Sequence, residues 1–143
     1  MKLLRVGSKT NEKPGILDKE GKIRDISSHI SDLNPENLNF NTFSKIKNLD
    51  LSNLPELSSS ERIGSCITKP GKFVAIGLNY SDHAAETGAA VPSEPIMFMK
   101  ATSSICGPND DVEIVSGSKK LDWEVELGII IGKDVKHISE NQS

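Results

Sequence analysis

Aromatic residues are scarce, making up only 4% of the 143 residues, and the apolar fraction of 36% is also low. A compact domain usually has more apolar residues, so either the core is small or the chain buries surface against another polypeptide. No apolar run approaches the roughly 20 residues that a membrane-spanning helix requires. The composition therefore excludes a protein embedded in a membrane by helices. The apolar runs of the second half argue against full disorder.

An excess of positive charge is also absent, because 17 basic residues face 20 acidic ones and the net charge is −3. This balance excludes a basic nucleic-acid interface and a polybasic membrane patch as the main function. The first residues lack the sustained apolar stretch of a signal peptide, so we expect a cytoplasmic protein. In that reducing compartment, Cys66 and Cys106 are expected to be free thiols, most simply as small buried apolar side chains.

Several well-known catalytic signatures are missing. There is no phosphate-binding glycine loop, no nucleotide fingerprint, no zinc-type spacing of Cys and His, and no nucleophile elbow. His29 and His137 stand alone in polar surroundings, and we interpret them as solvated side chains. Candidate functional residues must therefore come from other patterns.

Hydrophobic periodicity predicts a mainly β fold with short helices, of the α+β class. Apolar runs bounded by turn residues are typical of strands. Such runs occupy residues 3–6, 15–17, 22–26, 73–76, 96–99, 112–115 and 121–131. A short helix is expected at 81–86, with Ser81 as its N-cap and Gly88 as its terminator. The run Gly107-Pro108-Asn109-Asp110 predicts a tight turn, which would also suit the lining of a pocket.

Composition divides the chain into two parts. Asn41 is expected to cap a short helix in the polar stretch of the first half. Ser, Pro and Glu dominate between residues 49 and 67, which is typical of a linker. We therefore predict a small N-terminal β-containing domain with its linker at 1–66 and a second domain at 67–143.

One predicted strand, at 121–131, carries an acidic face. Side chains alternate along a strand, so Asp122, Glu124 and Glu126 share the face opposite the apolar one. Like charges at this spacing repel one another, and a hard divalent cation would relieve the repulsion. The alternative is an acidic edge strand that faces solvent and resists aggregation.

A second candidate pair follows the predicted strand at 73–76. On a helix, His83 and Glu86 lie at i and i+3 on one face, so Glu86 can orient the imidazole as a general base. The alternative is a surface helix with an incidental polar pair. Lys100 ends the next predicted strand, where it either steers an anionic substrate or is simply a terminal charge.

Four segments together resemble the fumarylacetoacetate hydrolase (FAH) family, because their order and spacing are specific although each alone is weak. The segments are Ile76-Gly77-Leu78-Asn79-Tyr80-Ser81-Asp82-His83-Ala84-Ala85-Glu86, Glu94-Pro95-Ile96-Met97-Phe98-Met99-Lys100, Cys106-Gly107-Pro108-Asn109-Asp110-Asp111 and Asp122-Trp123-Glu124-Val125-Glu126-Leu127 with Gly132-Lys133 after it. The first seventy residues are similar to the small N-terminal domain of many bacterial members.

The resemblance implies a β-roll catalytic fold, a divalent metal (Mg²⁺, Mn²⁺ or Ca²⁺) and a homodimer. It places the metal ligands on Glu124 and Glu126 and the catalytic dyad on His83 and Glu86. Tyr80 and Lys100 are the matching candidates for substrate binding. The implied substrate is a small oxo acid. The implied reaction is C–C bond cleavage of a dicarbonyl acid such as an acylpyruvate, or release of urea from ureidoglycolate. Isomerisation, hydration or decarboxylation of an oxo-dienoate are alternatives.

One departure from the family pattern concerns the third metal ligand. The family supplies it from an Asp in a later segment of Asn-Asp-Val type, and the sequence ends at Ser143 before such a segment. We therefore expect an incomplete catalytic domain that exposes apolar surface. A non-catalytic fragment or pseudo-enzyme that folds on a complementary partner is the alternative from another functional class.

Overall fold

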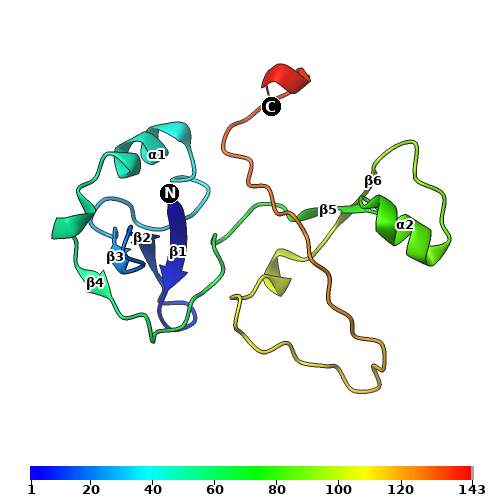
Figure 1. Cartoon of the computed structure of the whole chain (residues 1–143), viewed down its shortest axis with the longest axis horizontal. Helices are drawn as coiled ribbons and strands as arrows, with labels where there is room; N and C mark the ends of the chain where they lie inside the picture. Colours follow the sequence, from blue (N-terminus) through cyan, green and yellow to red (C-terminus); the bar gives the residue numbers. More distant parts are fainter. Residues whose placement is uncertain (143) are drawn as a thin grey trace. The chain divides into compact units, whose positions relative to one another are not determined.

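Apolar runs near the N-terminus form an antiparallel sheet in the computed structural model, which describes residues 1–142 (Figure 1). Its strands are β1 (Lys2–Val6), β2 (Lys13–Leu17), β3 (Ile23–Asp25) and β4 (Glu56–Leu57), in that spatial order. Leu3 lies opposite Ile16, and Leu17 lies opposite Ile23. The three strands predicted in this region are confirmed. The fourth was not predicted, because a two-residue strand has no periodicity to detect.

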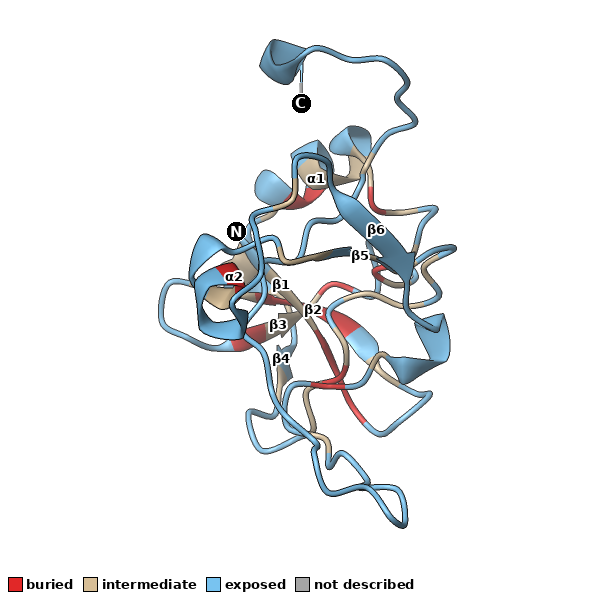
Figure 2. Cartoon of the chain, turned by 90° about the vertical axis from the view of Figure 1, so that its right-hand side faces the viewer, coloured by how far each residue is buried: buried red, intermediate tan, exposed pale blue. Residues whose placement is uncertain are grey.

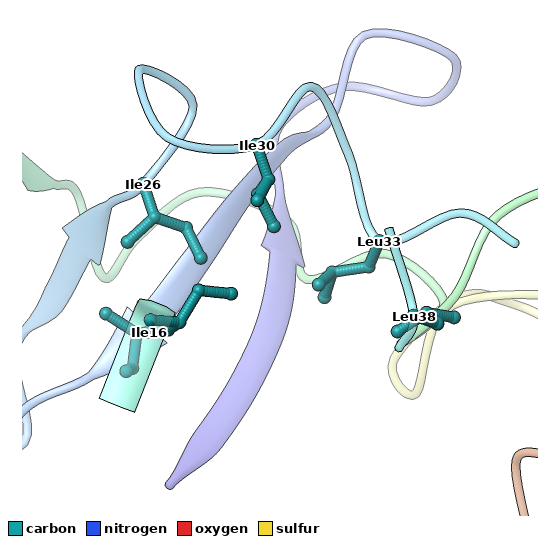
Figure 3. Packing of buried hydrophobic residues seen from close by; sticks show 6 residues of the cluster. Ile16, Ile26, Ile30, Leu33 and Leu38 are labelled. Carbon is teal, nitrogen blue, oxygen red and sulfur yellow. The ribbon is translucent and has the colours of Figure 1, made fainter. Parts of the chain in front are cut away.

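The core of this sheet comes largely from the irregular segment that follows β3. Six buried side chains form one cluster, and they are Ile16, Ile26, Ile30, Leu33, Leu38 and Ile46. Figure 3 shows five of them labelled, gathered beside the β1 and β2 ribbons. Four of the six belong to residues 26–38, which form turns instead of helix or strand. The fully buried members of this small core are thus all aliphatic.

Of the two remaining residues, β2 supplies Ile16 and a short helix, α1 (Phe40–Lys47), supplies Ile46. We expected Asn41 to cap this helix, and that prediction is wrong. Asn39 is the N-cap, because its side chain accepts a hydrogen bond from the Thr42 amide at 3.0 Å. Two asparagines lie within three residues here, and sequence alone does not say which one adopts the extended backbone of a cap.

Residues 49–67 have the composition of a linker but are largely structured. They contain the 3₁₀ helix η1 (Leu51–Asn53) and β4. Leu49, Leu51, Leu54 and Ile67 pack against the core cluster, half-buried. Isolated apolar residues among Ser and Pro do not form a periodic pattern. The core cluster that they contact is not visible in the sequence.

The chain divides into two units, and each is described by itself. The first unit is Met1–Thr68 together with the chain from Gly107 onward, and the second is Lys69–Cys106. The second unit contains β5 (Val74–Gly77), α2 (Ser81–Thr87), β6 (Ile96–Met99) and the 3₁₀ helix η2 (Thr102–Ser104). β5 and β6 pair antiparallel, with Val74 opposite Met99. The helix and both strands expected here are confirmed.

The strands expected at 112–115 and 121–131 are not formed, and this prediction is wrong. Within residues 1–142, the chain after Asp111 contains no strand and ends in the 3₁₀ helix η3 (Glu140–Gln142). Figure 1 draws this stretch as a tube without arrows, and Figure 2 colours nearly all of the chain toward the C-terminus as exposed. Alternation specifies how side chains point once a strand is paired, but the pairing itself needs a neighbouring strand.

The fold class is thus mixed α+β, mostly strands with two short α-helices. Among residues 1–142, no helix combines the length and the apolar character needed to cross a membrane.

Candidate functional site

The junction between β5 and α2 presents the predicted catalytic pair. Leu78 follows β5 with φ of 49°, a left-handed backbone that a leucine rarely adopts. Tyr80, in extended backbone, is then the N-cap of α2, so the expectation that Ser81 caps the helix is wrong. Gly88 ends the helix with φ of 66°, as predicted, because glycine adopts this conformation without steric cost. Sharp turns at both ends thus define a two-turn helix immediately after an apolar strand.

His83 and Glu86 lie within α2 at i and i+3, on one face of the helix. His83 is half-buried and Glu86 is exposed. Among the described residues, no hydrogen bond or ion pair joins the imidazole to the Glu86 carboxylate; the only bonds of His83 are through its backbone, to Asp82 and Thr87. The helix therefore brings the two side chains to one face, and the direct bond between them stays a prediction.

The two substrate-binding candidates belong to the same unit. Tyr80 is partly exposed at the start of α2, and Lys100 follows β6. The Lys100 amide donates to the Phe73 carbonyl at 2.8 Å, which extends the β5–β6 ladder by one bond. That bond fixes the Lys100 backbone while its side chain stays exposed. Substrate contact by these two residues stays a prediction.

The predicted metal ligands, Glu124 and Glu126, lie in the part of the first unit that forms no strand, and both are exposed. Carboxylate oxygens suit Mg²⁺, Mn²⁺ or Ca²⁺, so the donor chemistry fits the implied ion. Within residues 1–142, no three His, Cys, Asp or Glu side chains gather closely enough to hold a metal. The structure therefore provides two candidate ligands without a complete coordination sphere.

The residues around this acidic pair form a large exposed apolar surface. Its most exposed members alternate along the chain: Trp123 is 81% exposed and Leu127 is 78% exposed. Val125, Ile129 and Ile131 are exposed to a similar degree. The sequence-based expectation that the chain exposes apolar surface is confirmed. Soluble chains rarely leave so many large apolar side chains together in water, so this surface is a candidate for contact with other polypeptide.

Both cysteines are free, as predicted, but they are exposed instead of buried. Cys66 lies just before the end of the first part of the first unit, and Cys106 is the last residue of the second unit. The two cysteines thus lie near the two ends of the segment 69–106. A small apolar side chain is a reasonable core residue, but these positions lie where the chain passes from one unit to the other.

A network of ion pairs, which the sequence analysis missed, crosses the first unit. Its members alternate in charge in the order Asp32, Arg5, Glu12, Arg62 and Asp110. Arg5 donates to Asp32 at 2.7 Å and to Glu12 at 3.3 Å, and only 6% of Arg5 is exposed. Arg62 donates to Glu12 at 2.7 Å and to Asp110 at 2.6 Å. No spacing signal could have revealed it, because the partners lie up to 48 and 50 residues apart.

The network lowers the pKa of two of its carboxylates, Asp110 and Glu12. The hydrogen bonds from Arg62, supported by the Gly107 amide, lower the pKa of Asp110 to about 2. Burial would raise the pKa of Glu12, but the Arg62 hydrogen bond and the charges of both arginines outweigh it and lower that pKa. Both carboxylates are thus held ionised at neutral pH, which keeps the guanidinium groups paired.

Two cavities open on the first unit. One, of about 180 Å³, is lined by His29, Asn37, Thr42 and Lys45 among others. The other, of about 380 Å³, lies between the β1–β2 edge and the end of α1. Neither is lined by any of the six predicted site residues.

The comparisons with known proteins agree on a family. The family described as Fumarylacetoacetate (FAA) hydrolase C-terminal matches residues 72–143. That match covers half of the chain and includes His83, Glu86, Glu124 and Glu126. The chain therefore belongs to the fumarylacetoacetate hydrolase family.

Particular relatives extend the likeness into the first half of the chain. A Burkholderia ambifaria protein named "Putative hydrolase" is 53% identical over 140 residues, which is 98% of this chain and 50% of the relative. A Burkholderia multivorans protein of the same name is 54% identical over the same shares. The chain thus spans about half the length of the curated relatives it matches.

A solved structure gives the same picture of the fold. The crystal structure of a "putative HpcE protein" from Mycobacterium smegmatis aligns with a TM-score of 0.59 and 25% identity, over 82% of this chain and 42% of that one. The alignment again takes up less than half of the other protein.

Proposed function

We propose that this chain forms part of a divalent-metal-dependent hydrolase or lyase that acts on a small oxo acid. The observation that carries the proposal is the pair His83 and Glu86, which shares one face of α2 directly after β5, within the residues that the family matches. The finer family features belong to the same proposal: a β-roll catalytic fold, a homodimer and a location in the cytoplasm.

In this proposal His83 is the general base. The residue is half-buried, and histidine is a common general acid or base in enzymes. Glu86 lies one turn further along the same face and would accept a hydrogen bond from one ring nitrogen, leaving the other nitrogen free to take a proton. Glu86 is therefore the orienting residue, and its loss should affect the rate less than the loss of His83.

Glu124 and Glu126 would hold the metal, which we propose to be Mg²⁺, Mn²⁺ or Ca²⁺. A bound divalent cation polarises a substrate carbonyl and stabilises negative charge on its oxygen. Carboxylate oxygens are hard donors, which suits a hard cation. Further ligands must complete the coordination sphere of the metal, because the described residues supply no third ligand near these two.

The proposed chemistry follows from a positioned base. For a dicarbonyl acid such as an acylpyruvate, His83 takes a proton from water, whose oxygen bonds to the carbonyl carbon. The C–C bond then breaks, its electron pair stays on the enolate fragment, and the proton from His83 goes to that fragment. For ureidoglycolate, the base takes the hydroxyl proton, the C–N bond breaks, and urea leaves with the proton. Tyr80 and Lys100 would contact the substrate, with the Lys100 ammonium near its carboxylate. Isomerisation, hydration or decarboxylation of an oxo-dienoate would use the same residues.

The exposed apolar stretch around Trp123 favours a second candidate. A chain that leaves these residues in water is suited to fold against a complementary polypeptide, and it need not be catalytic on its own. Under this alternative, the chain would bind its partner tightly and show no turnover by itself.

Turnover assays separate the two candidates. The chain is assayed for acylpyruvate hydrolysis and for urea release from ureidoglycolate, with Mg²⁺, Mn²⁺ or Ca²⁺ added in turn. We expect metal-dependent turnover that falls about 10²- to 10⁴-fold in His83→Asn. His29→Asn is the matched control, because His29 is an exposed histidine outside the proposed site, and it should keep full activity. Measurable turnover that is equal in wild type and His83→Asn would refute the assignment, whereas no turnover by the wild type would favour the second candidate.

A further inference from the structure

The chain leaves the first unit after Thr68 and returns to it at Gly107. Between these points lies the segment 69–106, which carries α2 with His83 and Glu86. Arg62 precedes the exit and Asp110 follows the return, so the two residues flank the segment on either side. Their side chains meet in a two-pronged ion pair, with Nε to Oδ1 at 2.6 Å and Nη2 to Oδ2 at 2.6 Å.

The backbone of Arg62 is held by hydrogen bonds beside β1. The Gly7 amide donates to the Arg62 carbonyl at 2.9 Å, and the Gly64 amide donates to the Arg5 carbonyl at 2.8 Å. Val6 and Ile63 form an antiparallel bridge between these two bonds. Residues 62–64 thus run along β1 as a short additional edge, and the Arg62 backbone cannot move without breaking it.

The Asp110 side is fixed by its own turn. Asp110 Oδ2 accepts from the Gly107 amide at 2.7 Å, and the Asp110 amide donates to the Gly107 carbonyl at 3.2 Å. Gly107 is buried, and a Cβ on it would collide with the Ile63 carbonyl oxygen. The backbone of Gly107 therefore packs directly against the backbone of Ile63. Only glycine permits this close approach, because it has no Cβ.

The charges around the pair make it stronger than an ordinary surface ion pair. Arg62 also donates to Glu12, whose side chain is only 6% exposed, and Glu12 accepts from the buried Arg5. Two-pronged arginine–carboxylate pairs combine charge with fixed geometry, and partial burial reduces screening by water and salt. The pair is therefore the end of a rigid, sheet-anchored network.

We propose that Arg62 and Asp110 form a clasp that holds together the exit and the return of the chain around the segment 69–106. The clasp lies within the first unit, so it holds the exit and the return of the segment that carries His83 and Glu86 close together. Closing a long loop at its base removes much of the freedom of its ends. The clasp goes beyond the proposed function and does not depend on any metal or substrate.

The two cysteines make the clasp directly measurable. Cys66 and Cys106 are the only cysteines of the sequence, both are exposed, and they lie near the two ends of the segment. Nitroxide labels on both thiols of the full chain report the separation of the two ends by dipolar EPR. We expect one narrow distance distribution in the wild type and the loss of its narrow component in Arg62→Ala and in Asp110→Asn. Arg62→Lys should restore it only in part, because a lysine lacks the fork.

The matched control is Lys22→Ala, which removes the exposed pair of Lys22 with Glu56 at 3.2 Å in the same unit. It should leave the distance distribution unchanged. A second measurement guards against general unfolding: amide hydrogen exchange of Gly107 should speed up by roughly tenfold in Asp110→Asn, whereas amides in the β1–β2 ladder should keep their protection. An unchanged narrow distribution in Arg62→Ala, or equal loss of protection throughout the sheet, would overturn the clasp.

Discussion

Arg62 donates from Nη1 to Oε1 of Glu12 at 2.7 Å, although 50 residues separate the two in the chain. The same carboxylate accepts from Arg5 through its other oxygen at 3.3 Å. Glu12 is thus the central acceptor of the network, between two guanidinium groups that would repel each other without it. The loss of the Glu12 carboxylate should therefore weaken the pairing of both Arg5 and Arg62.

Replacement of Glu12 should therefore destabilise the first unit. Glu12→Gln keeps the volume but removes the charge, and we expect the free energy of unfolding to fall by about 2 kcal/mol. Urea denaturation followed by circular dichroism measures the loss. Glu36→Gln, which neutralises an exposed glutamate outside the network, is the control and should stay within about 0.5 kcal/mol of the wild type. Equal effects of the two variants would contradict a central role for Glu12.

Stability should depend on pH through Asp110. Its pKa is lowered to about 2 from the ordinary 3.8, so its pairing stabilises the folded state fully above about pH 4 and is lost as pH falls toward 2. Urea unfolding at a series of pH values measures this dependence. Asp110→Asn should be less stable at neutral pH and should show a shallower loss between pH 4 and 2. The comparison with the wild type is needed because Glu12, Asp18, Asp25 and Asp50 also titrate below their usual range. Parallel curves for the two proteins would refute the assignment.

The aliphatic core should tolerate truncation poorly. Ile26 is fully buried and Ile46 is 1% exposed, so either change to alanine leaves a cavity in the core cluster. We expect each substitution to lower the free energy of unfolding by about 3 kcal/mol. Ile131→Ala is the control, because Ile131 is 75% exposed, and it should cost less than about 0.5 kcal/mol. Thermal and urea unfolding of the three variants measure the difference, and a small cost for Ile26→Ala would show that the core lies elsewhere.

Metal binding should depend on the acidic pair. Titration with Mn²⁺, followed by the EPR signal of the free ion, measures the affinity of the chain. Glu124→Gln and Glu126→Gln should each weaken binding by roughly tenfold or more, because each removes a charged ligand. Glu113→Gln removes an exposed carboxylate outside the pair and should leave the affinity unchanged. Equal weakening by all three variants would indicate a general charge effect instead of a site.

The fluorescence of Trp123 should report on the apolar surface. It is the only tryptophan of the sequence and is 81% exposed, so its emission should resemble that of free tryptophan and be quenched readily by acrylamide. If the surface contacts another polypeptide, the emission should shift to the blue as protein concentration rises or as the partner is added. Trp123→Ser should weaken that association. A blue-shifted emission at high dilution would contradict the exposed position.

Local order was largely predictable from the sequence. The runs at 3–6, 15–17, 73–76 and 96–99 form strands near the predicted bounds, because an apolar run bounded by turn residues specifies its own conformation wherever a partner strand lies nearby. The helix around His83 and its end at Gly88 were equally predictable from the sequence. The run at 121–131 has the clearest alternation of all and forms no strand, since alternation does not supply the pairing that a strand needs.

What the sequence by itself determined is the family and the chemistry that the residues can offer: His83 and Glu86 at helical spacing, and Glu124 and Glu126 two residues apart among apolar neighbours. Only the tertiary structure decided which asparagine caps α1, that residues 56 and 57 complete a sheet, and that Arg62 meets Asp110 across 48 residues. The reason is physical: helices and turns depend on neighbours in the chain, whereas ion pairs, sheet edges and burial depend on residues that meet only after folding.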